Sequence, residues 1–339
     1  MKNKLSCILI IFIASVVVLP AFSFNVSQVK VGANPWAVSV NPTTDKIYVT
    51  NSGNNSVSVI DGKTNTVIKN VIVGDNPTGV GVNKITSTVY VSKFSSPTVS
   101  VIDGNTDTIS GTITVGNQPN GIGIDEIANK VYVANTNSGT VSVIDGKTNT
   151  VTSTVPVGAR PTAVAVNPSS ELAYVTNSGA GTVSVIDEKT DTVIKTIPVG
   201  ADTTGVAVDQ TENTIYVTSS KTSEVFTIDG STNTVTHTIA VGANPDGITV
   251  DPGLDRIYVA DSGGGTVSVI DGKTDTISGT IPAGTHVYGI AVNPSTGLVY
   301  AGNDSPGIVY VISDPEIPQT SNAIFDGLVQ FFSHLFGMS

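Results

Sequence analysis

The chain has 339 residues, and its 16 lysine and arginine residues against 27 aspartate and glutamate residues give a formal net charge of −11. This acidic balance argues against a nucleic-acid partner, since binding to phosphate backbones depends on clustered lysine and arginine side chains. Only 13% of the residues are charged and 39% are hydrophobic, a composition that argues against intrinsic disorder.

The first 23 residues have the pattern of an export signal. A basic start with two lysines precedes an apolar run from Cys7 to Phe22, and Ala21-Phe22-Ser23 fits a small-x-small cleavage site. We expect cleavage after Ser23, with an uncleaved membrane anchor as the alternative. Cys7 is the single cysteine of the chain, so the processed protein would have neither a disulfide nor a thiolate metal ligand. The expected location is secreted or on the outer face of the cell envelope.

The body of the chain, residues 24–313, repeats with a period of 42 residues. Seven tyrosines keep this step: Tyr48, Tyr90, Tyr132, Tyr174, Tyr216, Tyr258 and Tyr300. Each copy holds four short runs rich in valine, isoleucine and threonine, which in the fourth copy are 163–167, 172–177, 182–187 and 192–199. A repeat of this length with four strands is typical of one blade of a β-propeller. We therefore predict an all-β, seven-bladed propeller.

The first run of each copy alternates small residues with valine or isoleucine. In the third copy, Gly121 and Gly123 alternate with Ile122 and Ile124. Side chains alternate between the two faces of a strand, so this run has one small and one bulky face. We expect it to be the innermost strand of the blade, where the bulky face of one blade fills the space left by the small face of the next.

The two ends of the repeat region predict how the ring closes. The seventh copy lacks a fourth strand, because the chain continues after Ser313 as Asp314-Pro315. Residues 24–31 stand in register with the fourth strands of other copies, such as 150–157. We predict that this N-terminal strand completes the last blade, which removes open sheet edges.

Two segments carry a family resemblance. Tyr174-Val175-Thr176-Asn177 and Tyr48-Val49-Thr50-Asn51, each followed by TVSVID or a close variant, resemble the YVTN-type β-propeller repeat. The resemblance covers residues 24–313 and implies a propeller similar to those of archaeal surface-layer proteins and many secreted proteins. The wider superfamily includes relatives of haem d1 nitrite reductase, nitrous oxide reductase and streptogramin lyase. None of their site residues can be carried over to this chain.

Few residues suit catalysis or metal binding. The three histidines, His237, His286 and His334, share no spacing, so we expect neither a metal site nor a haem, and no cofactor. The repeated Asp-Gly-Lys-Thr segments, such as 61–64, are interpreted as tight turns, in which glycine allows positive φ and aspartate accepts hydrogen bonds from amides. A calcium site, the alternative, would require several oxygens that converge on one ion. No nucleophile, base and orienter set is recognisable, so we predict no catalytic residue.

Departures from the internal consensus give the candidate site. The position after the usual proline varies most, reading Trp36, Thr78, Asn120, Thr162, Thr204, Asp246 and Tyr288 in the seven copies. The preceding position adds Arg160 and His286, and Lys93 replaces the asparagine that usually ends the second run. We expect these loops at one end of the ring, above the central channel. The predicted ligand-binding residues are Trp36, Asn120, Arg160, Asp246, His286, Tyr288 and Lys93. An aromatic pair beside such polar groups suits a sugar or a peptide, and drift of tolerant loops is the alternative.

The C-terminal segment differs from the repeats. After a linker over 314–320, residues 321–339 predict an amphipathic helix, with an apolar face that runs from Ile324 to Phe336. This helix is too short to span a membrane. Three alternatives stay open: it lies in a membrane surface, pairs with another chain, or docks on its own propeller.

Two functional hypotheses follow. The first is a secreted or cell-surface propeller that acts as a non-catalytic binding or structural interaction module, with an envelope protein or glycan as its partner. The alternative is a channel-site enzyme of lyase or hydrolase type, for example one that uses His286 and Asp246 together. Regular turns, few histidines and the lack of cysteine favour the first hypothesis.

Overall fold

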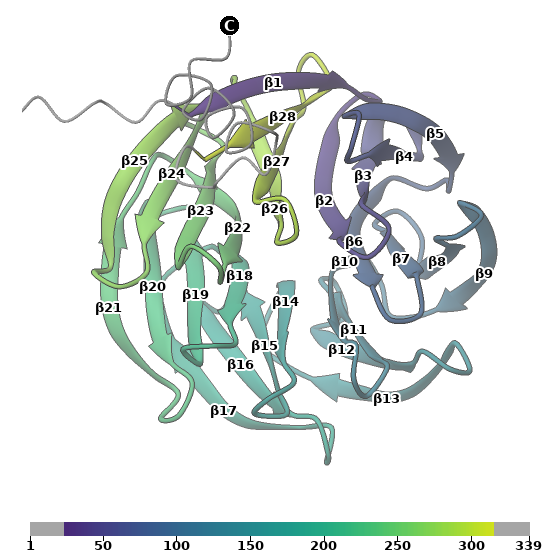
Figure 1. The fold of residues 1–339 in the computed structure, drawn as a ribbon. Coiled ribbons are helices and arrows are strands. Elements are labelled where there is room, and N and C mark those ends of the chain that lie inside the picture. The colour runs from purple at the N-terminus through teal and green to yellow at the C-terminus, as the bar shows by residue number, and fades with distance from the viewer. Residues whose placement is uncertain (1–23, 315–339) are drawn as a thin grey trace, which may run out of the picture.

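The computed structural model describes residues 24–314, which form seven four-stranded antiparallel sheets arranged around a central axis (Figure 1). This arrangement confirms the predicted all-β, seven-bladed propeller. The one helical element within these residues is the single 3-10 turn η1 (Ser52–Asn54), and no helix there is long and apolar enough to cross a membrane. The expected export segment and the expected C-terminal helix lie outside the described residues.

Each blade runs from an inner strand beside the axis to an outer strand at the rim. The inner strands are β2 (Pro35–Asn41), β6 (Pro77–Asn83), β10 (Pro119–Asp125), β14 (Pro161–Asn167), β18 (Thr203–Asp209), β22 (Pro245–Asp251) and β26 (Val287–Asn293). The second strands are β3 (Lys46–Asn51), β7 (Thr88–Lys93), β11 (Lys130–Asn135), β15 (Leu172–Asn177), β19 (Thr214–Ser219), β23 (Arg256–Asp261) and β27 (Leu298–Asn303).

The third and outer strands complete the sheets. The third strands are β4 (Ser56–Asp61), β8 (Thr98–Asp103), β12 (Thr140–Asp145), β16 (Thr182–Asp187), β20 (Glu224–Asp229), β24 (Thr266–Asp271) and β28 (Ile308–Ser313). The outer strands of blades one to six are β5 (Thr66–Ile72), β9 (Thr108–Thr114), β13 (Thr150–Pro156), β17 (Thr192–Pro198), β21 (Thr234–Ala240) and β25 (Thr276–Pro282).

The last blade closes the ring with both ends of the repeat region. Its sheet has the order β1-β28-β27-β26, and β1 (Asn25–Lys30) runs beside β28 in Figure 1. The pairing is antiparallel, with Asn25 opposite Ser313 and Lys30 opposite Ile308. The predicted closure by the N-terminal strand is therefore confirmed.

The small residues of the inner strands allow neighbouring blades to approach each other near the axis. A Cβ atom placed on Gly121 would lie 2.6 Å from the Cα atom of Ala163, and one on Gly289 would lie 2.6 Å from the Cα atom of Ala37. Real Cβ atoms do not reach such distances, so a larger residue would push the blades apart. The prediction that the first run is the innermost strand is confirmed.

The inner strands begin two residues earlier than the sequence indicated. In the fourth blade the strand starts at Pro161 rather than at Ala163, and its pairing with β15 is irregular between Pro161 and Val164. A bulge adds a residue to one strand and re-aims the side chains beside it. Thr162, which follows the proline, is one of the residues that line the channel.

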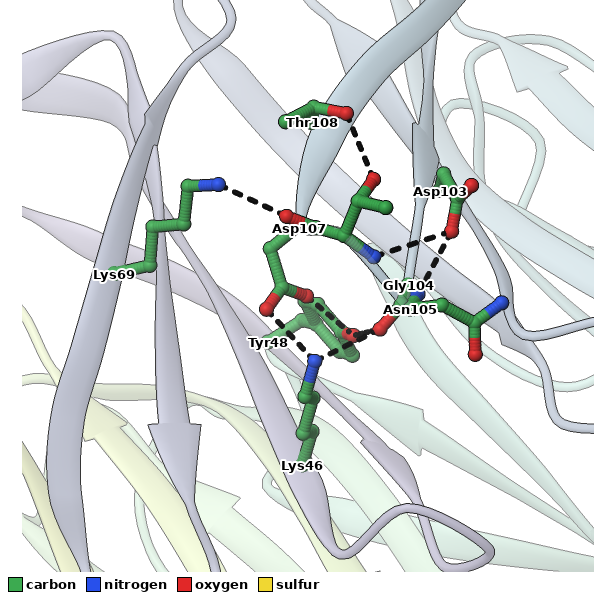
Figure 2. A network of polar contacts seen from close by, with 9 residues as sticks. Lys46, Tyr48, Lys69, Asp103, Gly104, Asn105, Asp107 and Thr108 are labelled. Carbon is green, nitrogen blue, oxygen red and sulfur yellow. Dashed lines mark hydrogen bonds and ion pairs between the residues drawn. The ribbon is translucent and has the colours of Figure 1, made fainter.

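The hydrophobic core lies between the blades, and the repeated tyrosines connect one blade to the next. Tyr48 is fully buried, packs against valines of its own and the following blade, and donates a hydrogen bond of 3.1 Å to Asp107 on the turn of that blade. Figure 2 shows Lys46 and Tyr48 converging on this carboxylate. Tyr300 makes the same bond across the ring closure, to Asn65 at 3.0 Å.

The repeated aspartates are turn residues, as predicted. Asp61 accepts hydrogen bonds from the backbone amides of Lys63 at 2.9 Å and Thr64 at 3.0 Å. The bond from Thr64 is the main reason why the pKa of Asp61 lies below its ordinary value. Asn65 follows with a φ of 50°, a left-handed conformation that asparagine tolerates better than most residues.

Candidate functional site

The channel opens through a ring of seven side chains, one from the start of each inner strand. They line a cavity of about 240 Å³ and are Trp36, Thr78, Asn120, Thr162, Thr204, Asp246 and Tyr288. The small residues that follow, such as Gly121 and Ala163, line both this cavity and an adjoining second one of about 230 Å³. Branched apolar residues such as Ile122 line the second cavity. We call the first cavity the channel mouth. Its seven ring residues all come from the repeat position that varies most between the copies.

Aromatic rings occupy one arc of the channel mouth. Trp36 of the first blade stacks on Tyr288 of the seventh, with ring centroids 4.6 Å apart and an interplanar angle of 16°. The ring of His286 lies nearly parallel to Tyr288 at 6.5 Å. Trp36 remains 37% exposed, so much of the indole is open to solvent in spite of the stacking. The two aromatic residues that the sequence placed in adjacent blades are in contact.

The threonines of the ring are already hydrogen-bonded within the fold. The hydroxyl groups of Thr78, Thr162 and Thr204 donate to backbone carbonyls of the next blade, at 3.4, 3.1 and 2.9 Å. The side chains of Asn120 and Asp246, in contrast, make no hydrogen bond to any residue from 24 to 314. Together with the phenol of Tyr288 and the indole N–H of Trp36, these are the polar groups of the ring that have no hydrogen bond within residues 24–314.

The carboxyl group of Asp246 is poorly hydrated. It is half-buried in the narrow channel mouth, and this burial raises the pKa of Asp246 to about 6. The pKa of Tyr288 in the next blade is also raised, first by burial and then by the negative charges of Asp304 and Asp246. Among the residues that line the channel mouth, Asp246 carries the single formal charge.

The sequence reasoning missed Asp304, which forms part of the rim beside the aromatic arc. Its carboxylate lies 3.3 Å from Nδ1 of His286, so the partner of His286 is Asp304. A signal for Asp304 was present, since it is the one acidic residue at the position that follows the second strand in the seven copies. His286 is exposed and does not line the cavity itself.

Arg160 lies outside the channel mouth. Its side chain is exposed, and the aliphatic part lies over Gly179 in the loop after β15, where a Cβ atom on that glycine would be 3.2 Å away. Its φ of 54° is shared by other residues at this repeat position, such as Asn34 at 53°. Arg160 is therefore at the same end of the propeller as the channel mouth but is directed to its surface.

Lys93 is also separate from the channel lining. It is buried beneath the loop between the first and second blades, where its ammonium group lies 3.5 Å from the carboxylate of Asp75. In the first blade, Asn51 takes this position and donates hydrogen bonds to Ser58 at 2.9 Å and Ser56 at 3.3 Å. Lys93 thus holds a loop, and the structure brings together four of the seven candidates in the channel mouth, with His286 at its rim.

The described part of the chain offers no metal centre, because no three histidine, cysteine, aspartate or glutamate side chains converge within residues 24–314.

Comparison with known proteins supports the fold. No protein-family profile matches the chain, and no curated protein matches its sequence. Among solved structures it is similar to a chain of Kuenenia stuttgartiensis hydrazine synthase, with a TM-score of 0.77 and 18% sequence identity, over 85% of this chain and 98% of that one. At this identity the similarity concerns the seven-bladed propeller alone.

Proposed function

We propose that this protein is a secreted or cell-surface propeller of the YVTN type that binds an envelope protein or glycan at its channel mouth without catalysis. The expected export segment and the YVTN-like repeats support the location. The observation that carries the binding role is the contrast within the ring: Asn120 and Asp246 have no hydrogen-bond partner within the described residues, and Trp36 is open to solvent. Exposed aromatic residues beside unpartnered polar groups in a concave site are typical of ligand binding.

A binding screen tests this proposal. The purified protein is screened against envelope glycans and exported proteins, and each ligand retained is tested again with Trp36→Ala and with Arg160→Ala. We expect Trp36→Ala to weaken binding about tenfold or more, as loss of a central aromatic contact does. Arg160→Ala, at the same end of the propeller but outside the channel mouth, keeps the wild-type affinity. Loss of binding with Arg160→Ala alone would place the site on the outer loops instead.

A channel-site enzyme is the second candidate, and one observation favours it. A carboxyl group with a pKa of about 6, as in Asp246, can exchange protons near neutral pH, and the His286–Asp304 pair is at the rim of the same cavity. A lyase or hydrolase that uses these groups would lose turnover with Asp246→Asn and with His286→Ala separately. Wild-type turnover in either variant would remove that residue from the mechanism.

A further inference from the structure

The channel mouth carries an imbalance of charge that none of its own residues corrects. Asp246 is the one charged residue among those lining the cavity, and neither lysine nor arginine lines it. The carboxylate has no hydrogen-bond donor within residues 24–314. Even a half-buried carboxylate without a donor is costly unless a ligand supplies one, and a positively charged donor offsets the cost best.

The aromatic arc points to the same chemistry. Trp36 and Tyr288 are stacked at 4.6 Å in the two blades that follow the blade of Asp246. Asp246 is near enough to Tyr288 for its charge to raise the pKa of the phenol. The faces of indole and phenol rings are electron-rich and attract ammonium and guanidinium groups.

The remaining ring residues disfavour a neutral sugar. A sugar is held by several hydrogen bonds around its hydroxyl groups, yet the hydroxyl groups of Thr78, Thr162 and Thr204 already donate to backbone carbonyls. Apart from the aromatic pair, Asn120 in the third blade is the one uncharged polar side chain of the ring that has no hydrogen bond within residues 24–314. The cavity of about 240 Å³ adjoins a channel section lined by glycine, alanine, valine and isoleucine, which offers no polar side chain to the hydroxyl groups of a sugar.

We propose that the channel mouth is a binding site for an organic cation, a primary ammonium or guanidinium group on an unbranched chain, held by Asp246 and by the Trp36–Tyr288 stack. This proposal rests on the proposed function and specifies the ligand chemistry of the same site. A lysine or arginine side chain of a partner protein and a free alkylamine both present this chemistry.

The single tryptophan of the chain makes the test direct, since Trp36 is in the site and reports on it through its fluorescence. The full-length protein is titrated at constant ionic strength with n-butylammonium, with guanidinium and, as neutral controls, with n-butanol and methyl glucoside. Constant ionic strength is needed because salt screens charge interactions. We expect saturable quenching by the two cations and none by the neutral compounds.

Matched variants assign the effect to the site. Asp246→Asn is expected to weaken n-butylammonium binding about tenfold or more, because it removes the charge and keeps the shape. Tyr288→Leu, which keeps the charge and removes one ring, weakens it by about three- to tenfold. Asp202→Asn, which removes an exposed carboxylate at the same end of the propeller, keeps the wild-type affinity. A thermal midpoint of Asp246→Asn that is equal to or above that of wild type excludes misfolding as the cause, and Tyr288→Leu provides a second readout.

The outcomes separate this inference from the proposed function. Saturable quenching by methyl glucoside without a response to cations, or equal cation binding by Asp246→Asn and wild type, would overturn the inference and leave a binding role of Trp36 standing. If the ligands of the wider screen are retained equally with Trp36→Ala, the proposed function fails as well. Tighter binding of N-acetyl-lysine amide than of n-butylammonium supports a partner protein as the source of the cation, and the reverse supports a free amine.

Discussion

The seven copies differ in sequence at both ends of the propeller, but the differences are compensated by a neighbouring residue at one end only. At the end that carries the turns between third and outer strands, which we call the turn end, a change in one blade is matched by a change in its neighbour. Lys46 lies 2.7 Å from Asp107, the acceptor of Tyr48, and Lys130 lies 3.1 Å from Asp191, which holds the same repeat position as Asp107. In three other cases the acceptor of the tyrosine is an uncharged asparagine, and the lysine is also absent. The pairs of replacing residue and acceptor are Thr88 with Asn149, Leu172 with Asn233, and Leu298 with Asn65.

The channel mouth shows variation without such compensation. Asp246 stands in the ring where three other copies have threonine, and no cation accompanies it among the residues that line the cavity. Unpaired buried charge lowers stability, so at the turn end it is neutralised within the fold. Its persistence at the channel mouth supports the proposal that the compensating charge belongs to a ligand.

The largest effect is expected from breaking a compensated pair. Lys46→Leu leaves the buried carboxylate of Asp107 without its cation and should lower the free energy of unfolding by about 3 kcal/mol. The double variant Lys46→Leu/Asp107→Asn copies the Leu172–Asn233 combination of the fourth and fifth blades. We expect it to recover to within about 1 kcal/mol of wild type in urea denaturation at pH 7. Equal losses in the single and double variants would show that the pair is not coupled.

A second substitution should raise stability at the turn end, where the buried carboxyl group of Glu188 is not neutralised by a cation within residues 24–314. Glu188 replaces the glycine found in five other copies, and burial, followed by the neighbouring Asp125, raises the pKa of Glu188 to about 8. The folded state therefore keeps a proton that the unfolded state, with a glutamate pKa of about 4.3, has lost. The free energy of unfolding falls as the pH rises between these two values.

Glu188→Gln removes this penalty. We expect the variant to be more stable than wild type by about 2 kcal/mol at pH 8 and nearly equal to it at pH 4, with a flatter dependence of stability on pH between them. Urea denaturation at both pH values measures the difference. A wild-type slope in the variant would mean that Glu188 is ionised in the folded protein.

Protonation of Asp246 should weaken the proposed cation binding, with a change in free energy smaller than the two changes in stability above. The ligand binds the ionised carboxylate, so affinity is lost as the pH falls below the pKa of about 6. At pH 5 the affinity for n-butylammonium should be about tenfold lower than at high pH, since one pH unit below a pKa leaves about a tenth of the group ionised. The other titratable groups of the aromatic arc and its rim are Tyr288, His286 and Asp304, and the remaining pH dependence of Asp246→Asn reports on them. An unchanged affinity at pH 5 would contradict the role of Asp246.

The smallest effect on stability is expected for a compensating ion pair that is exposed to solvent. In the sixth blade Asp275, at the repeat position of Asp107, lies 2.9 Å from Nδ1 of His237, a side chain that is 64% exposed. Exposed ion pairs contribute little, so His237→Gln should lower the free energy of unfolding by about 0.3 kcal/mol at pH 5. A loss as large as that of Lys46→Leu would show that exposure does not decide the strength of these pairs.

The repeat made the fold predictable, because the same pattern appears seven times and chance deviations average out. Comparison between copies also found the ring of Trp36, Asp246 and Tyr288, since variation at one repeat position becomes variation around one channel. It did not show that Arg160 and Lys93 lie outside the channel mouth, because a variable position does not reveal the direction of its side chain. Arg160 points to the surface with a left-handed backbone, and Lys93 is drawn beneath a loop by Asp75.

The charge pairs at the turn end could not be predicted from the sequence either, because they depend on which turn of the next blade lies beside each tyrosine. Lys46 and Asp107 are separated by more than one repeat, so neither the 42-residue period nor local spacing pairs them. The hydrogen bonds of the ring threonines are likewise made between blades, to carbonyls 41 residues further along the chain. Only the packed ring distinguishes Thr204, whose hydroxyl is occupied, from Asp246, whose carboxylate is free.

The contrast between the two ends is tested most directly by measuring both unfolding and n-butylammonium binding for Asp246→Asn and Lys46→Leu. We predict a crossed result: Asp246→Asn loses affinity about tenfold or more and keeps or gains stability, whereas Lys46→Leu loses about 3 kcal/mol of stability and, while folded, keeps its affinity. Wild-type affinity in Asp246→Asn, or a loss of stability there as large as in Lys46→Leu, would show that Asp246 serves the fold rather than a ligand.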